Sequence, residues 1–559
     1  MTMKNIKYTV ILVLSLIALV SCETTDLDKQ NNPNALSPNN ADIDLTMNAI
    51  MVRTGEFTNT MGSYGSRFTR IRNMFGRNYL NVFGPANFNG AWNQAYADIL
   101  NDIRTMNEQI DGLEGNFDKH KALGEIFEAY IVVTLVDYFG KIPYSEALNP
   151  EILNPKLDDG EEVYGAALTL LDNAIAKLKE PTVNDVGTDL YYDGDYEKWE
   201  KLANTLKMKI LFQQRLVAPS SVDQFKTIVS TGNYIEEGED FVFNWGDNLD
   251  NPNSRHPIYN VQYAPGGPDT WYMSNWLMDQ MRNGQATEDP RIRYYFYRQV
   301  DDVVSNVDPD SGSEKRCIIQ TIPPHYDDNN ILYCYPNNNR GLWGRDHGQD
   351  DGIPPDGFLR TAFGLYPAGG RFDDSSFEII DGNNYGANGA GITPILLAST
   401  VDFWRAEIAL EEDNDANAAS GFLKSGMEKH IAYVQSFTSR SSAAFDNTTE
   451  PSSAEVSDYI DEVVDEFDNA SGEKQLNIIG EQFFISLIGN GTDAYNFYRR
   501  TGAPTDIQPS VEPDPGLLPR TLWYPASEVT ANSKVSQKED LTPQVFWDNN
   551  PSTGFPVSN

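Results

Sequence analysis

Two tryptophans have surroundings that favour ligand binding over packing in a core. In a helix over 272–282, one apolar face already forms without Trp276, and its members are Met273, Leu277, Met278 and Met281. Trp343 lies in a polar loop between Gly341 and Gly344. An exposed indole face can stack on the flat C–H patch of a sugar ring. We therefore predict two exposed platforms for a glycan; the alternative for both rings is packing beneath neighbouring segments.

Polar and aromatic residues near these tryptophans are candidate partners for sugar hydroxyl groups. They are Trp271, Tyr272, Asp269 and Asn275 around Trp276, and Asn337, Asn338, Arg340, Arg345 and Asp346 around Trp343. Trp245 is a weaker candidate because the alternation Phe241, Phe243, Trp245 is equally typical of a buried strand face. Two stacked rings and a few hydrogen bonds predict dissociation constants in roughly the millimolar to micromolar range.

No catalytic motif is present in the sequence. The five histidines are scattered without an HExxH pair, and no phosphate-binding glycine loop or GxSxG elbow occurs. Adjacent carboxylates such as Asp301-Asp302, Asp350-Asp351 and Asp373-Asp374 are typical of solvated turns in an acidic protein. We predict a binding protein without metal or cofactor, and a glycoside hydrolase with unrecognised carboxylates is the least favoured alternative.

The charge of the chain restricts the class of ligand. There are 42 Lys+Arg against 81 Asp+Glu, which gives a formal net charge of -39. Such a field repels nucleic acid and polyanionic glycans. The ligand is therefore predicted to be a neutral polysaccharide or oligosaccharide, and a β-glucan of the laminarin type is the first to test.

The N-terminus has the pattern of a bacterial lipoprotein signal. Lys4 and Lys7 precede an apolar run from Tyr8 to Val20, which is followed by Cys22. We predict a signal peptide over 1–21, a lipidated Cys22, a tether over 22–40 and surface exposure at the outer membrane. The alternative is an ordinary secretory signal with a chance cysteine.

Two further cysteines, Cys317 and Cys334, remain in the mature chain. An oxidising exterior favours a disulfide between them, which would constrain the loop that carries Trp343. The alternative is two free buried thiols.

Helical periodicity covers much of the chain on both sides of a long irregular region. Helices are predicted over 91–110, 120–139, 162–179, 196–216, 392–410, 416–437 and around 478–488. Small residues such as Ala129 and Ala203 at presumed helix crossings indicate tetratricopeptide-like pairs stacked in a short solenoid. We predict one mostly α domain over 41–559, with a helical-pair scaffold over 41–219 and 391–505 and a loop-rich binding insertion over 220–390.

Several segments together resemble the SusD/RagB family of nutrient-binding outer-membrane lipoproteins. In chain order, these segments are NNPN at 31–34, LVDYFGKIPYSEA at 135–147, WEKLANTLK at 199–207, WRAE at 404–407, YRRTGAP at 498–504 and RTLWYP at 520–525. The resemblance extends from Cys22 to about Glu528.

This resemblance implies a SusD-like fold with four tetratricopeptide-like pairs. It also implies a partner, a SusC-like TonB-dependent barrel transporter to which the lipoprotein delivers its glycan. The shared segments belong mainly to the scaffold, so they imply the fold and the partner more strongly than the ligand. A peptide-binding protein of the RagB type is the alternative.

Overall fold

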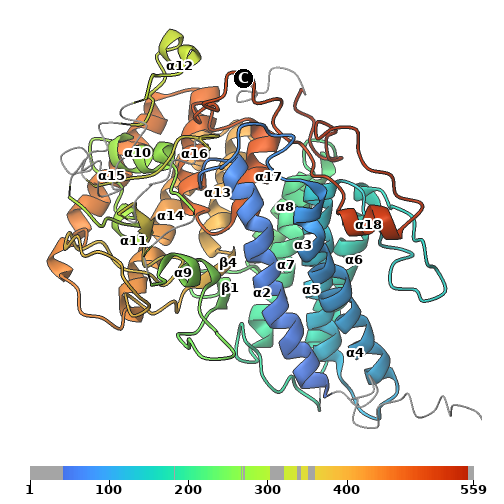
Figure 1. The fold of residues 1–559 in the computed structure, drawn as a ribbon. Coiled ribbons are helices and arrows are strands. Elements are labelled where there is room, and N and C mark those ends of the chain that lie inside the picture. Colours follow the sequence, from blue (N-terminus) through green and yellow to red (C-terminus); the bar gives the residue numbers. More distant parts are fainter. Residues whose placement is uncertain are drawn as a thin grey trace, which may run out of the picture.

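A computed structural model describes residues 42–181, 183–265, 267, 271–301, 320–335, 341–350 and 359–551 of the chain. Figure 1 shows the long N-terminal helices gathered on one side, and on the other the C-terminal helices together with loops and short helices. The prediction of a mostly α fold is confirmed. No helix in these ranges is both long enough and apolar enough to cross a bilayer.

The long helices of the N-terminal half lie side by side (Figure 1). They are α2 (Ile43–Phe68), α3 (Asn89–Asn93), a π-helical turn (Gln94–Leu100), α4 (Asn101–Asp111), α5 (Asp118–Phe139), α6 (Gly160–Lys179), α7 (Tyr196–Gln213) and α8 (Ser220–Thr231). The helix α5 packs on α6, α6 on α7 and α7 on α8. Gly140 ends α5 with a φ of 80°, a left-handed conformation that favours glycine.

The C-terminal half adds a second group of helices. These are α13 (Ala398–Glu411), α14 (Ala416–Gln435), α15 (Ser453–Asn469), α16 (Glu473–Ser486), α17 (Gly491–Thr501) and α18 (Ala526–Ala531). The helix α13 pairs with α14, and α17 packs against α2 although the two are far apart in sequence. This contact joins both halves in one continuous apolar core.

Between the two groups, the described residues form short elements. They are α9 (Pro257–Gln262), α10 (Asn275–Asn283), α11 (Ile292–Tyr295), α12 (Pro324–Asp328) and the strands β1 (Phe241–Asn244), β2 (Phe296–Tyr297), β3 (Ala362–Phe363) and β4 (Ile392–Leu396). The antiparallel partners are β1 with β4 and β2 with β3. The alternation of Phe241 and Phe243 is therefore that of a buried strand, and Trp245 donates from Nε1 to Thr393 Oγ1 over 3.0 Å.

One predicted helix is wrong in its first turn. Residues 392–396 form β4, and the helix α13 begins only at Ala398. Pro394 lies within this stretch, and a proline inside a helix removes a backbone donor and clashes with the preceding turn. The strand satisfies the backbone by pairing with β1 instead. The helix α2 was missed, although Asp42 caps its start by accepting from the amides of Asp44 and Leu45.

A buried charge cluster ties three helices together. The carboxylate of Glu407 on α13 accepts from Arg500 on α17 over 2.8 Å and from Arg215, just after α7, over 2.6 Å. Arg500 also donates to Gln213 Oε1 over 2.6 Å. All three charged side chains are at most 2% exposed. Their mutual pairing offsets the cost of removing these charges from water.

Candidate functional site

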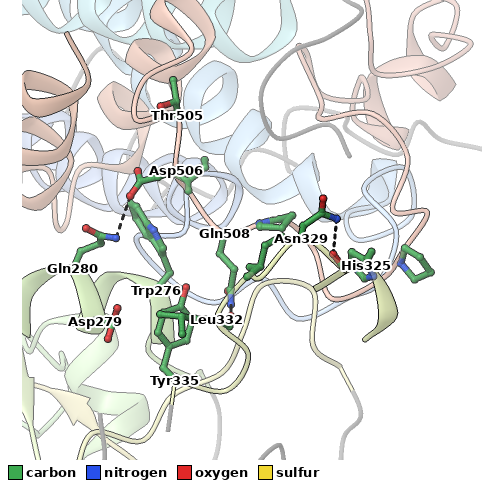
Figure 2. A pocket seen from close by; sticks show the side chains of 14 residues that line it. Trp276, Asp279, Gln280, His325, Asn329, Leu332, Tyr335, Thr505, Asp506 and Gln508 are labelled. Carbon is green, nitrogen blue, oxygen red and sulfur yellow. Dashed lines mark hydrogen bonds between the residues drawn. The ribbon is translucent and has the colours of Figure 1, made fainter. Parts of the chain in front are cut away.

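A cleft lies between α10, the segment around α12 and the segment that follows α17. We call it the α10 cleft; its volume is about 620 Å³. Its lining residues are Trp276, Asp279, Gln280, His325, Asn329, Ile331, Leu332, Tyr335, Thr505, Asp506, Ile507, Gln508, Pro509 and Pro513. Figure 2 shows Trp276 reaching from α10 towards Asp506, with Leu332 and Tyr335 beside it. The mixture of rings, apolar side chains and amide or carboxylate groups suits a sugar.

Local interactions fix the start of α10 and therefore the position of Trp276. Ser274 caps the helix, its Oγ accepting from the Leu277 amide over 3.4 Å. The backbone of Met273 pairs with Arg72, and that of Ser274 pairs with Arg345. Farther along α10, Gln280 Nε2 donates to Asp506 Oδ2 over 3.2 Å across the cleft. The helix is thus held on both sides before any ligand binds.

Two polar atoms at the cleft have no hydrogen-bond partner within the described part of the chain. These are Nε1 of Trp276 and Nδ1 of His325. The other ring nitrogen of His325 lies 2.9 Å from the carbonyl oxygen of Ser510. Because a carbonyl only accepts, Nε2 donates in this contact. Both partnerless atoms are buried in this conformation, so neither is presented to a ligand in the cleft.

The expectation that both tryptophan rings are exposed is wrong. Trp276 and Trp343 are each 2% exposed. Trp276 nevertheless borders the α10 cleft, whereas Trp343 does not line it. The backbone of Trp343 exchanges hydrogen bonds with Thr361, at 2.7 Å to Thr361 Oγ1 and 3.1 Å from the Thr361 amide. These bonds accompany the burial of residues 341–347, which the polar composition of the loop predicted to be exposed.

Two predicted hydroxyl partners, Asn275 and Asp346, are also buried, each at 0% exposure. Asn275 Nδ2 donates to Asp346 Oδ1 over 2.7 Å, and the Cys334 amide donates to Asp346 Oδ2 over 2.6 Å. The side chain of Asn73 donates to the Asp346 carbonyl over 2.7 Å. Asn275 and Asp346 therefore join separate segments behind the cleft, and their predicted contact with ligand is wrong for this conformation.

Tyr272 and Arg345 are buried against each other, at 8% and 6% exposure. The guanidinium carbons of Arg345 and Arg360 each lie 4.1 Å from the Tyr272 ring centroid. Cation–π contact of this kind occupies a ring face that a sugar would need. Trp271 is half-buried, with Arg72 stacked 4.1 Å from its ring centroid.

Several predicted residues lie outside the described ranges. These are Asp269, Asn337, Asn338, Arg340, the lipidation candidate Cys22 and the half-cystine candidate Cys317. Cys334 is disulfide-bonded. Its pairing with Cys317 stays a prediction.

Sequence reasoning missed most of the cleft. His325, Leu332 and Tyr335 come from the irregular region, and residues 505–513 follow the last long scaffold helix. The available signal was the proline-rich composition of 504–515 directly after α17, which rules out continued helix and indicates an irregular segment. Within the described ranges, no group of three His, Cys, Asp or Glu side chains is arranged to hold a metal ion.

Behind the cleft, Glu481 on α16 has a strongly altered acidity. Burial and the negative charges of Asp506 and Glu466 raise its pKa to about 8, against the opposing effect of Lys474. Asn477 donates to Glu481 Oε1 over 2.6 Å and accepts from the Thr505 hydroxyl over 3.0 Å. Glu481 is thereby connected to the segment that lines the cleft.

We expect Glu481→Gln to remove a pH dependence of stability. Between the ordinary glutamate pKa of 4.5 and the folded value of about 8, the unfolded chain loses this proton while the folded chain keeps it. The free energy of unfolding therefore decreases as pH rises through that window. Urea midpoints at both ends of the window should converge in the variant, whereas Glu473→Gln, at an exposed position of the same helix, should retain the parental difference. An unchanged difference in Glu481→Gln would contradict this assignment.

Comparisons with known proteins agree with this architecture. Residues 39–315 match a family model described as "Starch-binding associating with outer membrane", and residues 384–543 match "Susd and RagB outer membrane lipoprotein". A solved chitin-binding protein is 20% identical with a TM-score of 0.62, covering 92% of this chain and 100% of that one. Among proteins with a curated description, none matches.

Two further solved structures have the same fold. A SusD/RagB family protein from Bacteroides thetaiotaomicron is 18% identical with a TM-score of 0.63, covering 91% of this chain and 100% of its own. A chitin-binding SusD homologue from Flavobacterium johnsoniae is 18% identical with a TM-score of 0.61, covering 91% and 99%. At these identities the likeness shows a shared fold and does not identify the ligand of this chain.

Proposed function

Because the chain belongs to the SusD/RagB family of outer-membrane lipoproteins, we propose that it captures a neutral glycan in the α10 cleft and delivers it to a SusC-like TonB-dependent transporter. The observation that carries the proposal is the cleft itself, whose lining combines the rings of Trp276 and Tyr335 with the amide side chains of Gln280, Asn329 and Gln508. Lipidation of Cys22 would anchor the protein with its binding face at the cell surface. Incorporation of labelled palmitate, and its loss in Cys22→Ser, tests the anchor.

The cleft favours short, weakly held segments of a neutral polymer. Its volume of about 620 Å³ lies within the range of roughly 300–1,000 Å³ usual for small-molecule sites. Asp279 and Asp506 line it, and the whole chain has a formal charge of -39, so uronic or sulfated sugars would meet repulsion. Laminarin and chitin oligosaccharides are the first two ligands to compare, the second because two solved proteins of this fold are described as chitin-binding.

Calorimetric titration with laminarin, chitin oligosaccharides, alginate and a peptide mixture tests this function. We expect binding of one neutral glycan with a dissociation constant in roughly the millimolar to micromolar range. Affinity in this range permits release to a transporter. Binding of peptides alone would overturn the glycan proposal in favour of a RagB-like receptor.

We propose binding without hydrolysis. Glu481, whose raised pKa would suit a general acid, does not line the cleft. Incubating the protein with the bound glycan and assaying reducing ends should give no increase over time. Sustained release of reducing ends would replace this proposal with a glycoside hydrolase.

A further inference from the structure

Arg72 differs from the other buried arginines whose ion pairs tie the core together. Its side chain is 3% exposed. Arg291 pairs with Asp289 at 2.6 Å, and Arg500 pairs with Glu407 at 2.8 Å. Within the described part of the chain, Arg72 has no carboxylate partner. The buried positive charge of Arg72 is therefore not balanced in the way that those of Arg291 and Arg500 are.

The contacts of Arg72 leave much of its charge uncompensated. One terminal nitrogen donates to Ser63 Oγ over a long 3.3 Å, and Nε has no partner among the described residues. The guanidinium stacks on Trp271 at 4.1 Å. Burial lowers the pKa of Arg72, and the positive charge of the neighbouring Arg67 lowers it further. By contrast, the nearby Arg70 donates from all three nitrogens, to Gln508 O, Phe68 O and Tyr79 Oη.

A small cavity lies beside this guanidinium. Its volume is about 40 Å³, and its walls include Asn59, Ser63, Ser66 and Trp271 as well as Arg72. This volume exceeds the roughly 10–15 Å³ that one water needs, yet it is far below the size of a sugar site. Ser63 accepts from Arg72, so its own hydroxyl proton can point elsewhere. The wall thus presents N–H and O–H donors and a positive charge to the same small space.

We propose that this cavity binds a small monovalent anion, of which chloride is the probe to use. A buried cation without a counter-charge is costly, and two neighbouring cations increase that cost. The chain carries 81 acidic residues, yet none of those described pairs with Arg72. An external anion would accept from the Arg72 guanidinium and from Ser63, and would offset one of the two positive charges of Arg67 and Arg72. The inference does not depend on glycan binding.

Anion binding at this position would order the segment that leads into α10. The backbone of Arg72 pairs with Met273, and the Asn73 amide donates to the Tyr272 carbonyl over 3.4 Å. Trp271 adopts a φ of 38°, an unfavourable left-handed conformation for a bulky residue. In this conformation its ring stacks on Arg72. Neutralising Arg72 would therefore stabilise the whole connection between α2 and α10.

Thermal unfolding of the full mature chain in sodium chloride and in sodium gluconate of equal ionic strength tests the proposal. Gluconate is too large for the cavity but screens surface charge equally. We expect the melting temperature to rise by about 2 °C when chloride increases to about 100 times its dissociation constant, with no such rise in gluconate. Equal responses to both salts would overturn the proposal, because they would show general screening.

Two variants and a scattering measurement localise the effect. Arg72→Met should fold without the buried charge and lose the chloride response, while Arg104→Met, at an exposed position paired with Glu108, should keep it. Crystals soaked in bromide should show an anomalous peak within hydrogen-bond distance of the Arg72 guanidinium, which provides a result even if Arg72→Met does not fold. A chloride response retained in Arg72→Met, or a bromide-soaked crystal without a peak at Arg72, would contradict the assignment.

Discussion

Replacing Trp276 with alanine is expected to abolish measurable glycan binding and to lower the free energy of unfolding by about 3–5 kcal/mol. The binding loss follows because the indole forms part of the wall of the α10 cleft, beside Leu332 and Tyr335. The stability loss follows because the ring is only 2% exposed and packs in the core. Calorimetry below the melting temperature of the variant, together with urea unfolding, measures both effects.

Trp343→Ala is the matched control for this experiment. Its ring is also 2% exposed, so truncation should cost a similar free energy of unfolding. It does not line the α10 cleft, and we therefore expect glycan affinity within about twofold of the parent protein. Equal binding losses in the two variants would show that destabilisation alone explains the Trp276 result. Undiminished binding in Trp276→Ala would move the ligand site away from this cleft.

Replacing Glu407 with alanine is expected to destabilise the fold by about 3–5 kcal/mol, because it leaves Arg215 and Arg500 buried without their shared carboxylate. Urea unfolding measures this loss. Glu412→Ala is the control: Glu412 is 32% exposed and lies 3.2 Å from the same Arg215, so its loss should cost less than about 1 kcal/mol. Equal effects of the two substitutions would contradict the view that burial sets the strength of this cluster.

The same cluster predicts a loss of stability in acid. Burial acts to raise the pKa of Glu407, but attraction to Arg215 and Arg500 outweighs it and lowers the pKa below the usual value of 4.5. A carboxylate of this kind contributes stability above its unfolded pKa, and the contribution is lost as pH falls through the folded pKa. Acid unfolding should therefore begin at higher pH in Arg215→Met, in which one of the two attractive charges is removed.

Weak capture and a preformed cleft are compatible with a role in transport. Gln280 and Asp506 are hydrogen-bonded across the cleft without ligand, so little ordering of these two side chains is required on binding. A glycan would exchange this contact for others and leave again at low cost. Tight retention would prevent delivery to a membrane partner.

The helical scaffold could be predicted largely from local sequence patterns. Along α5 and α7, apolar residues recur at helical spacing, and Gly140 ends α5 where its composition predicts an end. Each of these signals depends on a few neighbouring residues, so it can be recognised without knowledge of the rest of the fold. The prediction was wrong for the first turn of the helix over 392–410, because these residues form β4 and hydrogen-bond to β1, about 150 residues away.

Ligand-site prediction from sequence was limited by distant contacts. The loop around Trp343 is rich in polar residues. Such a composition predicts an exposed loop only if the polar groups form their hydrogen bonds with water. Here Thr361, Asn275 and Asn73 supply those bonds from other segments, so residues 341–347 are buried. The cleft beside Trp276 likewise depends on Tyr335 and Asp506, which only the folded chain brings to α10.

The family, the mostly helical scaffold and the acidic field that disfavours anionic sugars could be predicted from residue types and their spacing along the chain. The folded structure was needed to show that Trp276 borders the α10 cleft and that Arg72 is buried without a carboxylate partner among the described residues. Burial and charge pairing depend on neighbours that approach from segments tens to hundreds of residues away, and no local pattern records them.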